Sequence, residues 1–154
     1  MKFSSLLKPT AVKVVGHQTS KKRLFHDLGE VASAAYGVDA MAAVEALLER
    51  ENLGPTGVGH GVALPHARIP GMKDVTGVFL RLEKPLNFDA VDRQPVDLVF
   101  ALFAPKESGV EHLKALALVS RTLRDGATCA KLRANTDPEA LFAVLTAAQG
   151  IQAA

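Results

Sequence analysis

The segment of residues 57–69 reads GVGHGVALPHARI and carries a glycine-rich run into the pair Pro65-His66. Its apolar part, residues 61–64, predicts a short strand that ends just before the histidine. Pro65 fixes its own φ and biases the preceding Leu64 towards extended backbone, which makes the approach to the imidazole stiff. Histidine has the side-chain pKa closest to neutral pH, so it can serve as a nucleophile or proton carrier with little adjustment. His66 is therefore our first candidate for a reactive residue.

Two alternatives compete with a reactive His66, a structural histidine and a metal ligand. By residue type alone, a hydrogen-bonded structural role is the more common one. Gly57, Gly59 and Gly61 favour reactivity, because glycines let backbone approach a ligand and leave N–H groups available for an anion. A metal shared with His60 is not expected, because six residues of extended strand span about 20 Å. No other metal-ligand spacing occurs in the sequence, so we expect neither a metal nor a cofactor.

His112 is the second candidate. The run Ser108-Gly109-Val110-Glu111 matches a capping box, which places His112 in the first turn of a helix. There the unpaired N–H groups and the positive end of the helix dipole favour a neutral imidazole and a nearby phosphate. A surface histidine in a first turn is the alternative. In the sequence, His17 and His26 are not part of any pattern of reactive or metal-binding residues, and we assign them no role.

Along the chain, segments with helical apolar spacing alternate with strand-like runs. We expect strands at residues 11–15, 61–64, 76–82 and 96–103. We expect helices at residues 19–36, 39–51 and 108–125, a short helix around Cys129, and a last helix opened by Asp137-Pro138. This alternation predicts one α/β domain in which helices cover a mixed sheet.

The same spacing predicts helix ends and inner faces. Gly37 should stop the first long helix, Asp39 should cap the second, and Thr128 should cap the short one. The inner faces should carry Met41, Val44 and Leu48 in the second helix, then Leu113, Leu116, Ser120 and Leu123, and finally Leu141, Val144 and Leu145.

Composition sets the class of protein. A chain of 154 residues is long enough for one domain with a proper core. Its net charge of +2 and scattered basic residues argue against nucleic acid as a partner. The single cysteine excludes an internal disulfide and fits the cytoplasm. No apolar run has the length of a signal peptide or a membrane span, so we expect no membrane insertion.

For the other polar residues, structural roles are more common than reactive ones. Asp89, Asp92 and Asp97 could act as acids or bases, but hydrogen-bond acceptors in turns beside a strand are the more common case. The triplet Lys21-Lys22-Arg23 is expected on a solvated helix face. Cys129 is expected to be a packed thiol.

The chain resembles a known family in three stretches. These are GVGHGVALPHAR from Gly57 to Arg68, the run FDAVDRQPVDLVFALFAP, and EHLKALALVSRTLRD after it. The order and spacing are similar to those of the fructose/mannitol class of IIA proteins in the bacterial phosphoenolpyruvate-dependent phosphotransferase system. The nearest resemblance is to the stand-alone nitrogen-regulatory branch, from about Ser5 to the last helix, residues 5–148. It implies a single domain over residues 1–154 with a mixed, mostly parallel sheet and helices on both sides.

The resemblance also implies a site and a chemistry. His66 would accept a phosphoryl group on Nε2, His112 would lie beside it and orient the phosphate or the ring, and Arg50 would offset phosphate charge. The donor would be a histidine phosphocarrier protein of the nitrogen branch. Regulated targets, such as sensor kinases or potassium transport components, would distinguish the two phosphorylation states. Two departures lie near the site: Pro55 stands where serine is common, and His60 stands where a polar residue such as asparagine is usual.

Two other functions stay open. The chain could be the IIA component of a fructose- or mannitol-type sugar permease, although no carrier or permease domain is fused to it. It could also be a binding module that keeps the fold without transferring phosphate. The presence of Arg50, His66 and His112 together argues against that second alternative.

Overall fold

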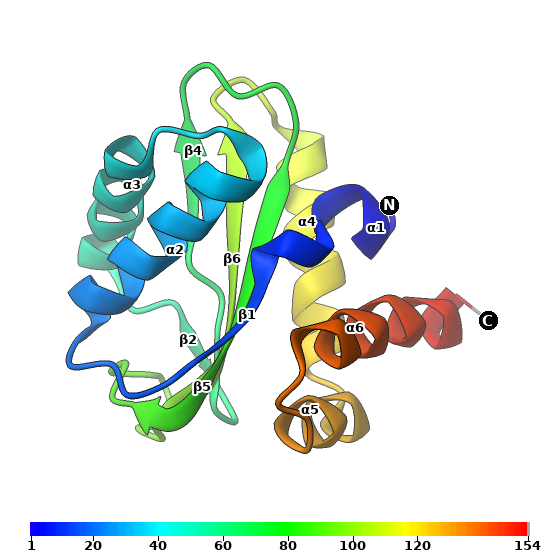
Figure 1. Cartoon of the computed structure of the whole chain (residues 1–154). Helices are drawn as coiled ribbons and strands as arrows, with labels where there is room; N and C mark the ends of the chain where they lie inside the picture. Colours follow the sequence, from blue (N-terminus) through cyan, green and yellow to red (C-terminus); the bar gives the residue numbers. More distant parts are fainter. Residues whose placement is uncertain (154) are drawn as a thin grey trace.

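A six-stranded mixed sheet forms the middle layer of the molecule (Figure 1). The computed structural model describes residues 1–153, with side chains described through residue 147. The strand order is β1-β5-β6-β3-β2, and β4 pairs with β6 outside this path. The strands are β1 (Val12–Val15), β2 (Gly57–Gly59), β3 (Val62–Ala63), β4 (His66–Ile69), β5 (Thr76–Leu86) and β6 (Val96–Pro105).

The sheet combines parallel and antiparallel pairs. Strand β1 runs parallel to β5, and both β3 and β4 run parallel to β6. The pairs β2–β3 and β5–β6 are antiparallel, and β5–β6 has the longest register. The expected mixed sheet is therefore confirmed, although its most extensive pair is an antiparallel one.

Strand β6 lies at the centre of the core. Its residues 98–104 are completely buried. A strand that is covered on both faces has no solvent side, which explains its continuous apolar sequence. The Phe100 ring packs edge-on against Phe3, with ring centroids 5.7 Å apart, and in a tilted arrangement against Phe79, with centroids 6.2 Å apart. These aromatic contacts join the sheet to the N-terminal segment.

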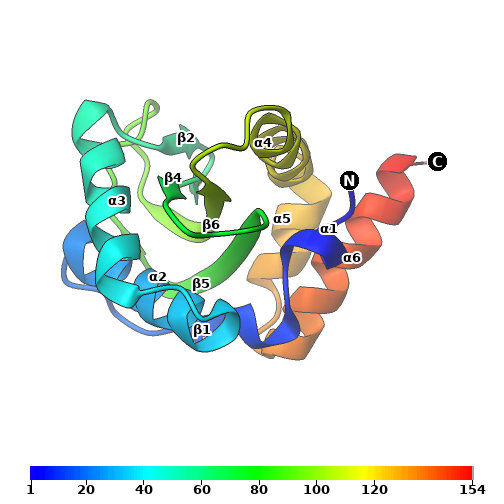
Figure 2. The same cartoon turned by 90° about the horizontal axis from the view of Figure 1, so that it is seen from above.

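Helices cover both faces of the sheet, as expected. Figures 1 and 2 show α2 (Lys21–Tyr36) and α3 (Ala40–Leu53) on one side. On the other side lie α1 (Phe3–Leu6), α4 (Val110–Leu123), α5 (Gly126–Arg133) and α6 (Pro138–Ala153). A short 3-10 turn, η1 (Pro9–Ala11), precedes β1. Among the helices of the described residues, none has the length and apolar character that crossing a bilayer would need.

Several predicted helix ends are confirmed. Gly37 ends α2 in the left-handed conformation at φ 74°, as predicted, and the Ser20 side chain, which was not predicted as a cap, caps the start of that helix. The Asp39 carboxylate accepts a hydrogen bond from the N–H of Ala42 and caps α3. Asp137 accepts one from the N–H of Glu139 just before α6. Short polar side chains at these positions satisfy N–H groups that a helix start leaves unpaired.

The predicted inner face of α3 is wrong by about one residue. Val44 is buried as expected, but Met41 is 53% exposed and Leu48 only partly buried. Ala43 and Leu47 are the buried neighbours of Val44. Positions 43, 47 and 50 lie one above another on a helix, so this rotation turns Arg50 towards the sheet.

The same correction applies to α4, whose capping box is absent. Gly109 is the N-cap, and the Ser108 hydroxyl donates to the carbonyl of Pro105 instead. Leu113 is 65% exposed rather than inward. The buried face consists of His112, Ala115, Leu118, Val119, Thr122 and Leu123. His112 is in the first turn as predicted, but it faces the core.

Helix α5 also begins differently from the prediction. Asp125, not Thr128, is its N-cap, and the Asp125 carboxylate accepts from both the N–H and the hydroxyl of Thr128. Cys129 is buried, and its thiol donates to the carbonyl of Leu123, so the expected packed thiol is confirmed. Leu141 and Leu145 of α6 are buried as expected, and Val144 is partly buried.

Strands β2 and β4 and helix α1 were not expected. Strands of three or four residues are too short for a periodicity to identify. Strand β4 gains its identity from its ladder to β6, which pairs His66 with Leu102 and Ile69 with Pro105. That partner is remote in sequence, so no local pattern could identify it.

Gly29→Ala should destabilise the fold, although alanine normally favours a helix. The new Cβ would lie 2.7 Å from Cγ2 of Val44 and 2.9 Å from the carbonyl oxygen of Ala40. Overpacking of this kind costs about 1–3 kcal/mol, which urea denaturation should show as a lower free energy of unfolding. Gly126→Ala is the control, because nothing lies within 4 Å of its Cβ position. Equal stability of the two variants would contradict the close α2–α3 contact.

Candidate functional site

His66 is presented by a break between two short strands. Strands β3 and β4 both pair with β6, one after the other, and Leu64-Pro65 separates them. The ladder continues across the break, because the Pro65 carbonyl accepts from the N–H of Leu102 at 2.9 Å. Proline has no N–H to donate, so it is tolerated only at an edge or an interruption of a sheet. His66 follows as the first residue of β4.

Two contacts define the protonation of the His66 ring. Its Nδ1 lies 2.9 Å from the carbonyl oxygen of Leu64. A carbonyl only accepts, so Nδ1 carries the proton and Nε2 keeps its lone pair. The Nε–H of Arg50 donates to that Nε2 at 3.3 Å. The unprotonated ring nitrogen is the one that can act as a nucleophile.

Arg50 reaches His66 from the last turn of α3. Its Nη1 donates to the carbonyl of Gly54 at 3.0 Å, just past the helix end. A guanidinium is stabilised there, because the carboxyl end of a helix carries partial negative charge. The remaining donors of its rigid fork suit an anion with several oxygens.

His112 faces His66 from the other side. The ring centroids are 5.7 Å apart and the planes meet at 87°. The His112 side chain is buried, and neither of its ring nitrogens has a hydrogen-bond partner among the described residues. A buried polar group without a partner costs about 1–3 kcal/mol. The first turn of α4 thus holds, against the His66 ring, an imidazole that has no hydrogen-bond partner among the described residues.

Both imidazoles favour the neutral form. Burial lowers the pKa of His66, and the Arg50 charge lowers it further, while the Leu64 carbonyl and the Glu51 carboxylate act in the opposite direction. Burial also lowers the pKa of His112, with help from the charges of His66 and Arg68. A neutral His112 was expected from the helix dipole, but burial is its largest cause.

Four groups beside the site were missed by sequence reasoning. Glu51 is nearly buried and binds Lys21, with Nζ to Oε2 at 2.9 Å. It also accepts from the N–H and the hydroxyl of Thr56, and the Leu64 carbonyl completes the set. In the sequence, the only indication of a role for these groups was that Glu51 and Thr56 lie next to Arg50 and the turn at residues 54–57. Lys21 lies over the Phe88 ring at 4.6 Å, so it does not belong to the solvated face predicted for Lys21-Lys22-Arg23.

The glycines before His66 have structural roles that were not expected. Gly59 and Gly61 have φ of 102° and 78°, and with His60 at φ 56° they form the turn between β2 and β3. A Cβ on Gly57 would meet the Cβ of Ala90 at 2.7 Å. Only glycine combines such φ values with close packing at low cost.

The remaining polar candidates stabilise loops. Asp92 accepts from the N–H groups of His60 and Gln94, and Asp97 forms an ion pair with Arg133 at 3.0 Å. Both are acceptors beside a strand, as predicted. The Arg68 guanidinium donates to the carbonyls of Lys106 and Ser108, just before α4.

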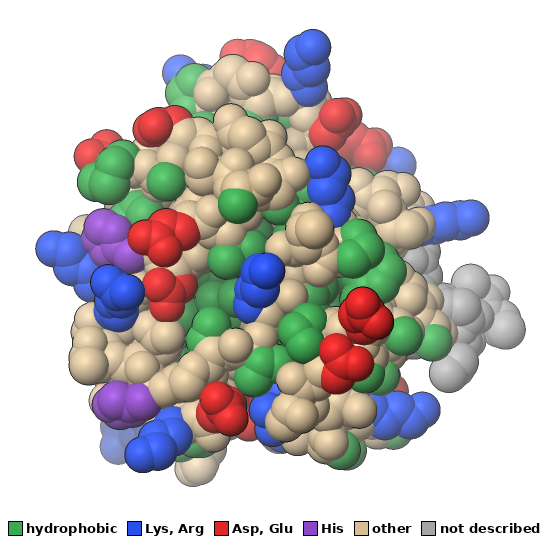
Figure 3. Space-filling model, viewed as in Figure 1, with side chains coloured by type: hydrophobic (Ala, Val, Ile, Leu, Met, Phe, Trp, Pro, Cys, Tyr) green, Lys and Arg blue, Asp and Glu red, His purple; other side chains and the backbone are tan. Residues whose placement is uncertain are grey.

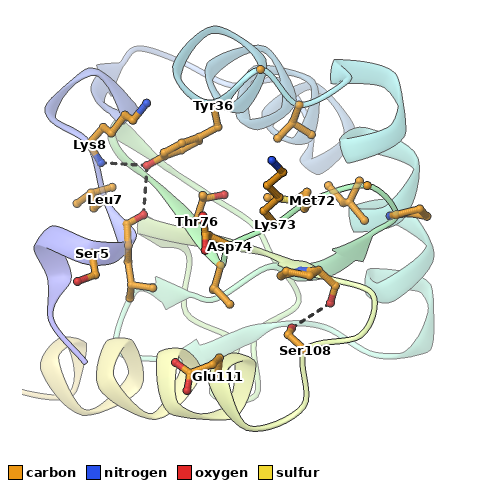
Figure 4. A pocket seen from close by; sticks show the side chains of 18 of the residues that line it. Ser5, Leu7, Lys8, Tyr36, Met72, Lys73, Asp74, Thr76, Ser108 and Glu111 are labelled. Atoms are coloured by element: carbon orange, nitrogen blue, oxygen red, sulfur yellow. Dashed lines mark hydrogen bonds between the residues drawn. The ribbon is translucent and has the colours of Figure 1, made fainter.

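A groove of about 970 Å³ lies next to the site rather than in it. Tyr36, Met72, Lys73 and Thr76 are among its lining residues, which come from the N-terminal segment, the end of α2 and the loop after β4 (Figure 4). His66, Arg50 and His112 do not line it. In the view of Figure 1, acidic and basic side chains are interspersed over the surface of the molecule (Figure 3). We therefore place the chemistry at the imidazole pair.

Comparisons with known proteins identify the family and the fold of the chain. Residues 5–148 match the family model described as "Phosphoenolpyruvate-dependent sugar phosphotransferase system, EIIA 2". A nitrogen regulatory protein of Bradyrhizobium diazoefficiens is 43% identical over 145 residues, 94% of this chain and 95% of that protein.

Solved structures point the same way. The nitrogen regulatory protein IIA-Ntr of Neisseria meningitidis superposes with a TM-score of 0.83 at 35% identity, over 92% of this chain and 97% of that one. Enzyme IIA for mannitol from Escherichia coli, solved with phosphorylated enzyme IIB, has a TM-score of 0.72 over 91% and 98% of the two chains. At 21% identity, that second similarity concerns the fold alone.

Arg50→Gln should raise the pKa of His66, because it removes a positive charge that disfavours the imidazolium. NMR titration of the wild-type ring should give a midpoint below 6.5, the ordinary value, and a higher one in the variant. An unfolded histidine takes up its proton at higher pH than this one, so the free energy of unfolding should fall as pH drops through 6.5. The exposed Arg121→Gln is the control. A midpoint shifted equally by both variants would contradict the Arg50–His66 contact.

Proposed function

Because the chain belongs to the EIIA type 2 family of the phosphoenolpyruvate-dependent sugar phosphotransferase system, we propose that it carries a phosphoryl group on Nε2 of His66. The observation that carries the proposal is the arrangement around that atom. Nδ1 is protonated towards Leu64, and the Arg50 guanidinium lies beside the free Nε2. The function is that of a phosphocarrier of the nitrogen-regulatory branch rather than of an enzyme that releases a product.

The transfer needs no proton to move. The lone pair of His66 Nε2 attacks the phosphorus of a phosphohistidine on the donor protein as the donor's P–N bond breaks. The bond electrons return to the donor ring, which becomes neutral. The His66 ring becomes cationic, keeps its Nδ1 proton and carries the dianionic phosphoryl group. Since little covalent chemistry is required, positioning and charge stabilisation supply most of the catalysis.

Arg50 and His112 have separate roles in this step. The Arg50 contact with Nε2 is long at 3.3 Å, so its Nε–H can move from the ring to a phosphoryl oxygen as the new bond forms. His112 has an unpaired ring N–H beside the same space and can donate it to a second oxygen. Lowered pKa values keep both rings neutral, which preserves the nucleophile and reduces charge repulsion between them.

The donor is a histidine phosphocarrier protein, which docks around His66. Exposed apolar side chains on the two flanking helices support this: Leu53 follows Arg50 on α3 and is 82% exposed, and Leu113 follows His112 on α4 and is 65% exposed. Exposed apolar side chains around a polar centre are typical of transient protein interfaces. Once phosphorylated, the site gains about two negative charges. Target proteins, sensor kinases or potassium transport components among them, would bind one state and reject the other.

A IIA component of a sugar permease is the second candidate. The Escherichia coli mannitol protein, which was solved with phosphorylated enzyme IIB, has this fold, but the 43% and 35% identical relatives are nitrogen regulatory proteins. A binding module without phosphoryl transfer would have no use for a free Nε2 beside a guanidinium. The cytoplasmic location expected from the sequence stays a prediction.

Incubation with phosphoenolpyruvate, enzyme I and the histidine carrier of the nitrogen branch should add one acid-labile phosphoryl group, seen by intact mass. His66→Ala should abolish the adduct, because no other residue offers the same nitrogen. His112→Ala should slow phosphorylation by about 10²-fold, the usual effect of one lost transition-state donor. A normal adduct in His66→Ala would refute the site, and transfer only from the sugar-branch carrier would favour the permease component.

Leu113→Gln should weaken docking of the phosphorylated carrier while leaving the chemistry intact. Loss of one interface side chain costs on the order of 1 kcal/mol, so KM should rise about fivefold with little change in kcat. Met41→Gln is the matched control, because Met41 is 53% exposed at the opposite end of α3 from Arg50. Equal effects of the two substitutions would contradict a docking face around His112.

A further inference from the structure

We propose that Glu51 is a positioning residue for His66, acting through a chain of hydrogen bonds that ends at Nδ1 of the imidazole. The inference rests on the proposed function and deepens it. Glu51 touches neither the ring nor the space where a phosphoryl group would lie. Its influence has to pass through intervening groups, and the structure contains an unbroken set of them.

The chain of hydrogen bonds begins at the carboxylate. Oε2 of Glu51 accepts from the N–H of Thr56 at 2.9 Å, and Oε1 accepts from the Thr56 hydroxyl. The carbonyl of Thr56 accepts from the N–H of Leu64 at 3.0 Å. The carbonyl of Leu64 in turn accepts from Nδ1–H of His66 at 2.9 Å. Every donor in this series points towards the carboxylate, so the position of Glu51 fixes Thr56, Thr56 fixes Leu64, and the Leu64 carbonyl fixes the imidazole.

The environment of Glu51 keeps this charge in place. Its side chain is 7% exposed, and Lys21 is its ion-pair partner at 2.9 Å. A buried carboxylate is very unfavourable unless it is paired and hydrogen-bonded, and here both oxygens are engaged. Lys21 is held in turn by the face of the Phe88 ring at 4.6 Å. The carboxylate therefore has one position, from which it orders the residues ahead of β2.

Glu51 also acts on the other side of the ring through its backbone. Its carbonyl accepts from the N–H of Gly54 at 3.1 Å, which closes the end of α3. The carbonyl of Gly54 then accepts from Nη1 of Arg50. One residue thus supports both groups that contact the imidazole, the Leu64 carbonyl at Nδ1 and the Arg50 guanidinium at Nε2.

The Leu64 carbonyl stabilises the His66 ring most strongly after phosphoryl transfer, when the ring is cationic. Nδ1–H is a stronger donor in a phosphoimidazolium ring, and the Leu64 carbonyl is already aligned to accept it. The negative charge of Glu51 favours that cation through space, because it acts to raise the pKa of His66. Without the charge, the Nδ1-protonated tautomer loses its advantage, and a ring protonated on Nε2 has no lone pair for attack.

Glu51→Gln tests the proposal in the full chain, since it keeps the shape of the side chain and removes its charge. We expect phosphorylation by the carrier to slow on the order of tenfold, because a hydrogen-bond chain anchored on a charge is lost. Nitrogen NMR of the unphosphorylated protein should show wild-type His66 protonated on Nδ1 and a growing Nε2-protonated population in the variant. A residue that merely stabilised the fold would not shift this tautomer ratio. Glu49→Gln, an exposed position on the same helix, should change neither quantity.

A second pair of variants covers the case in which Glu51→Gln does not fold. Thr56→Val keeps the N–H but removes the buried hydroxyl, and we expect a smaller shift of tautomer and rate in the same direction. Thr56→Ser keeps a hydroxyl at this position, so its tautomer ratio and phosphorylation rate should match those of the wild-type protein. The inference would be overturned if Glu51→Gln had the same phosphorylation rate and the same tautomer ratio as the wild-type protein. If Glu51→Gln does not fold, the same comparison is made with Thr56→Val. If the wild-type protein accepted no phosphoryl group, the proposed function would be overturned instead. The tautomer ratio of His66 in the unphosphorylated variants would still test whether Glu51 positions the ring.

Discussion

The ladder of strand β6 is the constraint on which the rest of the structure depends. Residues 98–104 are completely buried, so their backbone groups have to pair within the sheet. One edge of β6 pairs with β5, and the other pairs first with β3 and then with β4. The chain between β3 and β4 has to follow that edge while accommodating a proline. Because the Pro65 carbonyl keeps its bond to Leu102, the break stays short and His66 starts β4 in a defined place.

The position of β4 explains how residues from opposite layers meet. Within the part of the chain that the structure describes, strand β4 pairs with β6 alone, and no strand pairs with its other edge. Figure 2 shows β4 between α3 and α4, which belong to the two helical layers. Arg50 therefore reaches His66 from one face of the sheet and His112 from the other. A histidine in a central strand would have strands on both sides and could not collect both partners.

The balance of the site is electrostatic. The His66 imidazole lies against a guanidinium and a second imidazole, with a nearly buried carboxylate close by. Glu51 is paired with Lys21 at a distance from Nε2, and the charged group in contact with Nε2 is the Arg50 guanidinium. An incoming dianionic group would meet this charge and the unpaired nitrogens of His112. The Arg50 charge that favours a phosphoryl group also disfavours a second proton on the His66 ring. Together with burial, it lowers the pKa of His66.

The amino-acid sequence by itself determined the α/β class, the main helices and strands, the caps at Asp39 and Asp137, and His66 as the reactive candidate. Local rules suffice for these, because periodicity, capping and proline geometry involve residues that are close in the chain. The roles of Arg50 and His112 came from resemblance to a family, and the amphipathic pattern pointed their helices about one residue away from the observed faces. Packing against the sheet decided those rotations, since the buried face of a helix is chosen by its neighbours. Only the tertiary structure could reveal the tautomer of His66 and the link from Glu51 through Thr56 to Leu64, because each depends on partners brought together by folding.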